Sequence, residues 1–204
     1  LSELKGKPLT TDVSPTVAFQ VGVLQGTMHS IRPPEGKLLT GLPNEFPHWS
    51  HFIEKQFYSF AEDVITVVDD YLYRKAIEKF EEMKQQLPPH DGPSFVHMDF
   101  RPANIIIDSN QVSGMIDFES VRFGSTEIDF TKLNRDFLSF NPAFYEAFQE
   151  GYKSVRPLID LDTVLPFYSF IDAFNSIGWS KRRGIEKNAL FLEENLAKLK
   201  TFVM

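Results

Sequence analysis

Hydrophobic positions recur with a helical period over most of the chain. They predict helices over 15–29, 126–138, 142–155, 161–180 and 185–202, and two helices between 49 and 86. The first helix is apolar on most faces, so we expect it to be buried. Ser14-Pro15 is a typical helix start, because proline fits the first helical turn, and Leu87-Pro88-Pro89 ends the 49–86 region.

A strand pattern interrupts the helices in the middle of the chain. Ser94-Phe95-Val96 leads into a polar loop, and the apolar runs 104–107 and 112–116 are separated by the turn residues 108–111. These two runs predict a hairpin. A hairpin would place Asn104 and Asp117 near the same end, with Asp99 on the loop five residues before Asn104.

Asn104 and Asp117 suit a magnesium site. Mg²⁺ takes oxygen ligands, needs few of them from the protein, and completes its shell with water and phosphate. Asp99 could then reach the hydroxyl group of an acceptor molecule. Arg101 carries a planar guanidinium that can neutralise charge on phosphoryl oxygens. The pattern therefore predicts a phosphotransferase.

The same residues carry a resemblance to a known family. His97-Met98-Asp99 with Asn104, and Ile116-Asp117-Phe118-Glu119, resemble the H-G-D-x-x-x-x-N and I-D-[FW]-E elements of the aminoglycoside phosphotransferase and choline kinase family. The segment 124–129, with Asp129 at its end, resembles the G-D-P-x-x-D element that follows. Met98 replaces the usual glycine, and Ser125-Thr126 replaces Asp-Pro. Neither departure removes a group that the chemistry needs.

The resemblance implies a fold and a set of cofactors. The expected fold is α+β and mostly α-helical: the C-terminal lobe of the protein-kinase-like fold with a small catalytic β-hairpin. ATP would be the phosphoryl donor, and Asn104 and Asp117 would hold Mg²⁺. Asp99 would be the catalytic base, and Arg101 stands where protein kinases place a Lys or Arg near the transferring group.

Other residues of the motifs have supporting or open roles. We expect His97 to hydrogen-bond backbone and fix the loop, and Asp129 to accept hydrogen bonds from catalytic-loop amides rather than merely complement a helix start. Because strand side chains alternate, Ile106 shares a face with Asn104. Ile106 and Ile116 are either contacts for adenine or plain core. Glu119 either helps to hold a second metal ion or lies at the surface.

Residues 1–10 have no helical period and resemble the L-x-G-x-x-L hinge that joins the two lobes in this family. The small, nucleotide-covering lobe would precede residue 1. Gly22, Gly26 and Gly36 are too scattered to form a phosphate-binding loop. The expected organisation is a hinge remnant over 1–10 and a kinase-like C-terminal lobe over 11–204, with the N-terminal nucleotide lobe absent and the fragment alone inactive.

The composition and charge of the chain narrow the possible classes of function and substrate. The 204 residues, 42% of them hydrophobic, can bury a core. A net charge of −7 argues against nucleic-acid binding and permits a cationic substrate. The lack of cysteine fits a cytoplasmic protein, and no apolar run is long enough to span a membrane. Acidic residues on the 49–86 helices could line a site for an amine, although a solvated helix face is the default: Glu54, Glu62, Asp63, Asp69 and Asp70.

The sequence thus predicts an ATP- and Mg²⁺-dependent phosphotransferase acting on a hydroxyl of a small molecule. An aminoglycoside is one candidate acceptor; choline, homoserine and sugars are others, and the motifs do not choose among them or fix the oligomeric state. One alternative is a kinase-like binding or regulatory module without turnover. Another is a helical scaffold with a chance motif, which predicts that Asp99, Asn104 and Asp117 are scattered in space.

Overall fold

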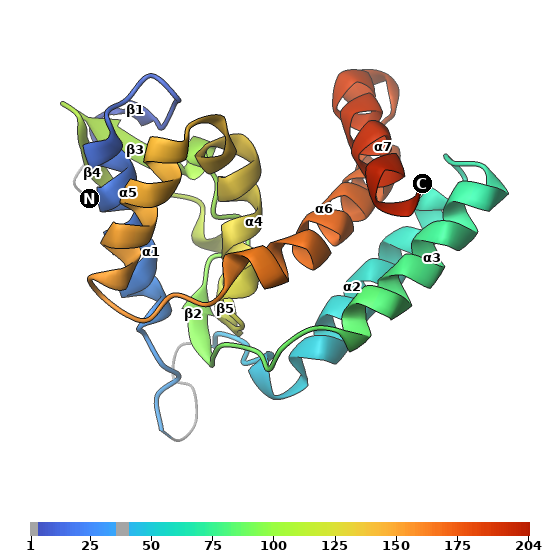
Figure 1. Ribbon diagram of the computed structural model, residues 1–204, viewed down its shortest axis with the longest axis horizontal. Helices are drawn as coiled ribbons and strands as arrows, with labels where there is room; N and C mark the ends of the chain where they lie inside the picture. Colours follow the sequence, from blue (N-terminus) through green and yellow to red (C-terminus); the bar gives the residue numbers. More distant parts are fainter. Residues whose placement is uncertain (1–3, 36–40) are drawn as a thin grey trace. The chain divides into compact units, whose positions relative to one another are not determined.

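The computed structural model describes residues 4–35 and 41–204, and these form two compact units (Figure 1). Unit 1 contains the chain up to residue 47 together with 90–161, and unit 2 contains 48–89 and 162–204. The sequence analysis did not separate them. Within the described residues, none of the helices has the length and apolar character needed to cross a membrane.

Unit 1 combines helices with two small sheets. Its helices are α1 (Pro15–His29), α4 (Glu127–Asp136) and α5 (Pro142–Lys153), with the short 3₁₀ helices η1 (Phe46–His48), η2 (Pro102–Asn104), η3 (Phe118–Ser120) and η4 (Leu138–Phe140). Its strands are β1 (Lys7–Pro8), β2 (Ser94–Val96), β3 (Ile105–Asp108), β4 (Gln111–Met115) and β5 (Arg122–Gly124). One antiparallel sheet has the order β1-β3-β4, and β2 pairs with β5 in the other.

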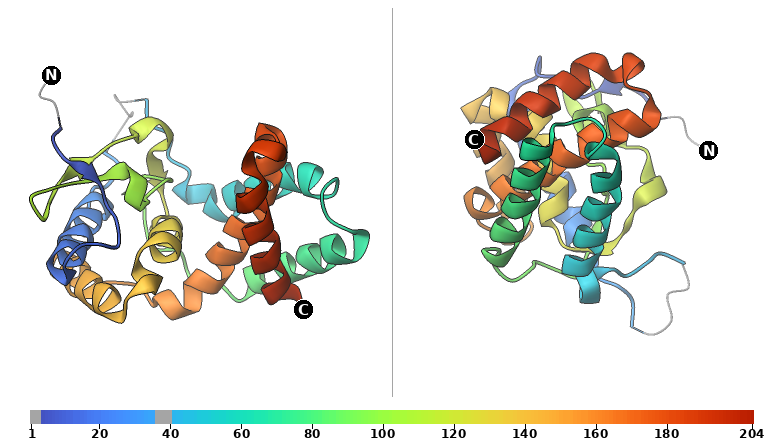
Figure 2. Two further views of the ribbon diagram at one scale, coloured as in Figure 1. Left: turned by 90° about the horizontal axis from the view of Figure 1, so that it is seen from above. Right: turned by 90° about the vertical axis from the view of Figure 1, so that its right-hand side faces the viewer.

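The predicted buried helix is present as α1, which lies along α5 (Figures 1 and 2). A Cβ atom on Gly22 would lie 2.2 Å from the Phe148 carbonyl oxygen, and one on Gly151 would lie 2.0 Å from the Phe19 carbonyl oxygen. Both distances are far inside van der Waals contact. The glycines therefore let the two backbones approach closely, which is a packing role that the sequence analysis did not assign to Gly22.

The predicted hairpin is confirmed as β3 and β4, with Ile105 opposite Met115. Its turn residues Ser109 and Asn110 have positive φ, as a two-residue hairpin turn requires. The strand begins at Ile105, however, and Asn104 ends the preceding 3₁₀ turn. Asn104 therefore lies one residue before the strand, and the strand face expected to be shared by Asn104 and Ile106 stays a prediction.

The described part of the hinge segment is more than a linker. Lys7 and Pro8 pair with Ile107 and Ile106 as the edge strand β1, and the Leu9 amide donates to the Ile105 carbonyl at 2.8 Å. Leu1 to Glu3 lie outside the described residues. β5 was not predicted, since three residues ending in glycine carry little strand signal.

Unit 2 consists of α2 (Trp49–Val64), α3 (Asp70–Gln85), α6 (from Leu161, one residue before the unit, to Arg183), η5 (Glu186–Asn188) and α7 (Ala189–Val203). The two helices predicted between 49 and 86 are confirmed. The last helix starts at Ala189 rather than 185, because a 3₁₀ turn precedes it. Figure 2 shows α2 and α3 side by side.

Aromatic rings fill the interior of unit 2. Phe57 on α2 stacks on Phe80 of α3 with ring centroids 3.9 Å apart, and on Phe174 of α6 at 4.2 Å. Phe170 of α6 contacts Phe202 of α7 edge-on. Tyr71, in the first turn of α3, lies outside this interior and is 57% exposed.

Candidate active site

The end of the hairpin brings two motif residues together. The Ile116 amide donates to the Asn104 carbonyl at 2.9 Å, directly beyond the Ile105–Met115 pair. Asp117 follows with φ 67° and ψ 58°, a left-handed conformation that is uncommon for a residue with a side chain. Among the described residues, the Asp117 carboxylate has no hydrogen-bond or ion-pair partner. It lies exposed at the end of the hairpin.

Asp99 lies at the centre of a set of polar contacts. Asn104 Nδ2 donates to the Asp99 carbonyl at 2.9 Å and to its Oδ2 atom at 3.0 Å. Lys132 Nζ donates to Oδ1 at 2.5 Å. Arg101 Nε lies 3.1 Å from Oδ2 as an ion pair, although its N–H makes no hydrogen bond there. One carboxylate is thus held by an amide and two cations.

These contacts determine the protonation of Asp99. Burial raises the pKa of this carboxyl, but the charge and hydrogen bond of Lys132, then Arg101 and Asn104, lower it by more. The net pKa of Asp99 lies below its ordinary value. The group is therefore a carboxylate at neutral pH, and it can accept a hydrogen bond from a hydroxyl.

Asp129 holds the backbone of the loop that carries Asp99. Its Oδ2 atom accepts the His97 amide at 2.6 Å, and its Oδ1 atom accepts the Met98 amide at 2.7 Å. Asp129 is buried in the first turn of α4, so these charge-assisted hydrogen bonds form away from water. Met98 has φ 69°, which favours glycine, so the loop holds a residue with a side chain in an unfavourable backbone conformation.

His29 supports Asp129 from the end of α1. Its Nε2 atom lies 3.3 Å from Asp129 Oδ2, and its Nδ1 atom lies 2.9 Å from the Tyr152 hydroxyl. Burial raises the pKa of Tyr152 above its usual range, so its phenol stays protonated and can donate to Nδ1 when the ring proton is on Nε2. A proton on Nε2 then points at the carboxylate. Sequence reasoning used His29 only as a helix end.

His97 connects the two motif loops. Its ring is fully buried, and Nε2 donates to the Ile116 carbonyl at 3.0 Å, one residue before Asp117. The loop of Asp99 and the loop of Asp117 are therefore tied through one imidazole. This is a contact to backbone, as the sequence analysis expected for this residue.

The other candidate residues differ in exposure. Ile106 is buried in β3 between Pro8 and Gly114, whereas 42% of Ile116 is exposed. Glu119 lies exposed in η3. The Arg101 side chain is 43% exposed, so its guanidinium can reach a bound molecule. Nothing in these positions assigns an adenine contact or a second metal ion.

Lys132, which pairs with Asp99, is another residue of the site that sequence reasoning missed. A signal was present, because Lys132 follows Asp129 by three residues on α4 and residues at that spacing share a helix face. Its charge lies beside Asp99 only because Asp129 holds the loop against the same helix. The spacing thus indicates that Asp129 and Lys132 share a helix face. Only the tertiary structure shows that the loop of Asp99 packs against that face.

The acidic residues considered for an amine-bearing acceptor are mostly engaged within unit 2. Lys84 pairs with Glu54 at 3.2 Å, and Arg182 pairs with Asp63 at 2.5 Å. Two more of these acidic residues interact within α3: Asp69 caps its first turn, and Asp70 pairs with Arg74. These contacts agree with the default interpretation of a charged helix surface.

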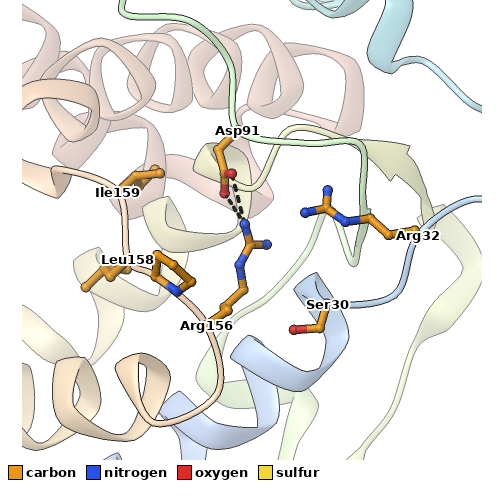
Figure 3. A pocket seen from close by; sticks show the side chains of 7 residues that line it. Ser30, Arg32, Asp91, Arg156, Leu158 and Ile159 are labelled. Atoms are coloured by element: carbon orange, nitrogen blue, oxygen red, sulfur yellow. Dashed lines mark hydrogen bonds and ion pairs between the residues drawn. The ribbon is translucent and has the colours of Figure 1, made fainter.

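A separate cavity of about 410 Å³ lies in unit 1, between the ends of α1 and α5 (Figure 3). It is lined by Ser30, Arg32, Asp91, Arg156, Pro157, Leu158 and Ile159. Arg156 pairs with both carboxylate oxygens of Asp91, at 2.9 and 2.7 Å, and donates to the His29 carbonyl at 2.8 Å. Its guanidinium therefore fixes the end of α1 to the segment before β2.

Comparisons with known proteins agree with this geometry. The model of a family described as "Phosphotransferase enzyme family" matches residues 1–167. A homoserine kinase of Gluconobacter oxydans (strain 621H) is 39% identical over 72 residues, which is 33% of this chain and 23% of that protein. The matched segment is thus less than a quarter of that relative's length.

Solved structures show the same fold at low sequence identity. The chain superposes on the GDP and kanamycin complex of APH(2")-IIia with a TM-score of 0.72 at 15% identity, covering 98% of this chain and 68% of that one. For the apoenzyme of the macrolide 2'-phosphotransferase MphH from Brachybacterium faecium, the TM-score is 0.65 at 16% identity, with 97% and 67% covered.

These likenesses confirm the expected fold class, which is mostly helical and protein-kinase-like with a small catalytic hairpin. They also exclude a helical scaffold with a chance motif, since Asp99 and Asn104 are in contact and Asp117 lies at the paired end of the same hairpin. The family model covers most of the chain, including every residue of the site. The chain therefore belongs to the phosphotransferase enzyme family.

Proposed function

We propose that this chain is the catalytic lobe of an ATP- and Mg²⁺-dependent kinase that phosphorylates a hydroxyl group of a small molecule. The observation that carries the proposal is the ionised Asp99 carboxylate, held by Asn104 on one side and by Lys132 on the other. Family membership supports the reaction class. An ATP-dependent reaction also fits a cytoplasmic enzyme.

The residues present fit a magnesium ion. Asn104 uses its Nδ2 group on Asp99, which leaves Oδ1 without a hydrogen-bond partner among the described residues. The Asp117 carboxylate is likewise unpartnered in that part of the chain. The described residues contain no cluster of three or more His, Asp or Glu side chains that could hold a metal, but Mg²⁺ needs only one or two protein ligands. When bound, the ion would neutralise charge on the donor phosphates.

Asp99 then acts on the acceptor. Its carboxylate orients the acceptor hydroxyl and takes its proton, while the hydroxyl oxygen forms a bond to the terminal phosphorus and the bond from that phosphorus to the diphosphate oxygen breaks. The low pKa of Asp99 makes it a weak base, so its main contribution is orientation, with proton transfer late in the reaction. His97, Asp129 and the Met98 amide keep the loop in place.

The donor side needs residues that this sequence does not contain. It has no glycine-rich loop followed by a strand lysine, the elements that cover the phosphates in protein kinases. We therefore assign the activity to a longer protein that carries this chain as its large lobe, joined through the segment 1–10. Calorimetry of the isolated chain with ATP and Mg²⁺ tests this, with weak binding expected and submicromolar affinity contradicting it.

The acceptor is proposed only by class. Kanamycin in a structural neighbour supports an aminoglycoside, and the homoserine kinase relative supports a small amino alcohol. Both are hydroxyl compounds that carry an amine, in agreement with a cationic substrate for a protein of net charge −7. A binding module without turnover remains the alternative outcome of the test.

The test is a phosphorylation screen of the full-length protein against aminoglycosides, amino alcohols and sugars. We expect one class to be phosphorylated, and Asp99→Asn to lower turnover of that acceptor by roughly 10²- to 10⁴-fold with little change in nucleotide affinity. Asp108→Asn, at the exposed end of β3, is the matched control and should keep full turnover. Unchanged turnover in Asp99→Asn would refute the assignment of Asp99.

A further inference from the structure

Lys132 has a position that the role of Asp99 alone does not explain. Its Nζ atom lies 2.5 Å from Asp99 Oδ1, and its side chain is 33% exposed. It comes from α4, whose Asp129 holds the backbone of the same loop at His97 and Met98. The helix α4 thus holds the backbone of the loop through the Asp129 carboxylate, and it holds the Asp99 carboxylate of that loop through the Lys132 ammonium group.

The two carboxylate oxygens of Asp99 are not equivalent. Oδ2 accepts the Asn104 amide and faces Arg101, so both of its neighbours belong to the motif loop. Oδ1 has only Lys132 as a partner among the described residues. An acceptor hydroxyl is therefore best received at Oδ1, beside the ammonium group.

Distances then place Lys132 near the reacting atoms. A hydroxyl oxygen donating to Oδ1 would lie about 2.7 Å from it. Since Nζ lies 2.5 Å from the same atom, the hydroxyl oxygen and the ammonium are no more than about 5 Å apart. Lysine carries three N–H groups, and Asp99 uses one. The other two can donate to oxygens of a phosphoryl group that approaches that hydroxyl.

We propose that Lys132 is a catalytic residue that contacts the transferring phosphoryl group from the acceptor side, a role that rests on the phosphotransferase function proposed above. Arg101, whose Nε–H makes no hydrogen bond, would approach the same group from the loop. As the acceptor proton passes to Asp99, the carboxylate loses its charge. The ammonium of Lys132 then has the phosphoryl oxygens as its remaining anionic partner, which favours the product-like geometry.

The test uses a phosphoryl analogue and needs no identified acceptor. The full-length protein is titrated with ADP and Mg²⁺, with and without aluminium fluoride, which mimics the transferring group with water in place of the acceptor. We expect aluminium fluoride to lower the dissociation constant of ADP by about 100-fold or more, as for other transition-state analogues. Lys132→Met should lose most of that tightening and keep the affinity for ADP alone, and Lys132→Arg should recover part of it.

Control variants separate this role from effects on folding or on general charge. Lys153→Met removes a lysine from the exposed surface of α5 in the same unit and should keep the full tightening. Lys132→Gln is a second neutral variant, and melting temperatures of both Lys132 variants should match the parent. If Lys132→Met and Lys132→Gln keep the full tightening, the proposal is wrong.

Two further outcomes are distinguishable. If the parent protein shows no tightening at all, the phosphotransferase function itself fails, and the role of Lys132 falls with it. If Lys132→Met has no further effect in an Asp99→Asn background, Lys132 acts only through Asp99 and is a positioning residue, which overturns the direct contact. Separate losses that multiply in the double variant support it.

Discussion

The interiors of the two units differ in how many polar and charged groups they bury. In unit 2, large rings stack on one another around Phe57, which is fully buried. In unit 1, backbones approach closely at Gly22 and Gly151, and charged or polar groups such as His29 and Asp129 are buried with their partners. Unit 1 also buries aromatic rings, such as Phe137 stacked on Phe144, so the difference lies in the buried charged groups and close backbone contacts that it adds.

This difference matches where the candidate site lies. Burial of apolar area is non-directional, so an aromatic interior stabilises helices without fixing any one group within a few tenths of an ångström. A buried polar group needs its partner at a defined distance and angle. Every residue proposed for catalysis belongs to unit 1, where the polar interior positions the loop that carries Asp99. The comparison predicts different sensitivities to mutation in the two units.

The largest effect on stability should come from the loss of side-chain volume in the interior of unit 2. Phe57→Ala removes a ring that contacts Phe80 and Phe174, and we expect it to lower the free energy of unfolding by about 3–5 kcal/mol. Chemical denaturation followed by circular dichroism measures this. Tyr71→Ala is the control, because Tyr71 is mostly exposed and should cost less than about 0.5 kcal/mol. Equal costs would refute an interior built on Phe57.

The next largest effect should come from added volume in unit 1, where the backbones of α1 and α5 are in close contact. Gly151→Ala places a methyl group against the Phe19 carbonyl, so α1 and α5 must move apart, and we expect a cost of about 1–3 kcal/mol despite the better helix propensity of alanine. Gly26→Ala is a graded control, because its Cβ would lie 3.2 Å from the Tyr152 carbonyl oxygen. It should cost clearly less. A Gly151→Ala variant as stable as the parent would contradict the close packing of these helices.

The smallest effect should come from relief of backbone strain beside the site. Met98→Gly places glycine at φ 69°, and relief of the backbone strain should stabilise the fold by about 1 kcal/mol. Glycine also adds entropy to the unfolded chain, which opposes this gain. The net increase in the free energy of unfolding should therefore be below about 1 kcal/mol. Ser109→Gly, at φ 50° in the hairpin turn, should behave similarly. Thermal melting compares them. A clear destabilisation by Met98→Gly would show that the methionine side chain contributes more to the loop than its backbone strain costs.

Much of the architecture followed from pattern alone. The helical periods gave α1 to α7 to within a few residues, and the β-branched runs gave the β3–β4 hairpin. The errors occur where short-range signals are weak: β5 has three residues, η5 shortens the last helix, and Asn104 lies in a 3₁₀ turn before the strand. Such turns are decided by contacts with the rest of the fold rather than by local propensity.

The site was predicted unevenly for a related reason. Asp99, Asn104 and Asp117 are close in sequence, so one hairpin is enough to bring them together, and the spacing reveals it. Lys132 reaches Asp99 from 33 residues away, and His29 reaches Asp129 from a distance of 100 residues. No periodicity within a segment encodes such contacts.

The sequence by itself determined the order of helices and strands, the family and the residues of the motif loops, because these depend on local pattern and short spacing. Only the tertiary structure decided that His29 and Tyr152 support Asp129, and that Lys132 donates to Oδ1 of Asp99. The physical reason is that these contacts depend on the hydrogen bonds from α4 to the loop of Asp99 and on the close approach of α1 and α5. That approach is fixed by glycines and buried hydrogen bonds acting between segments far apart in the chain.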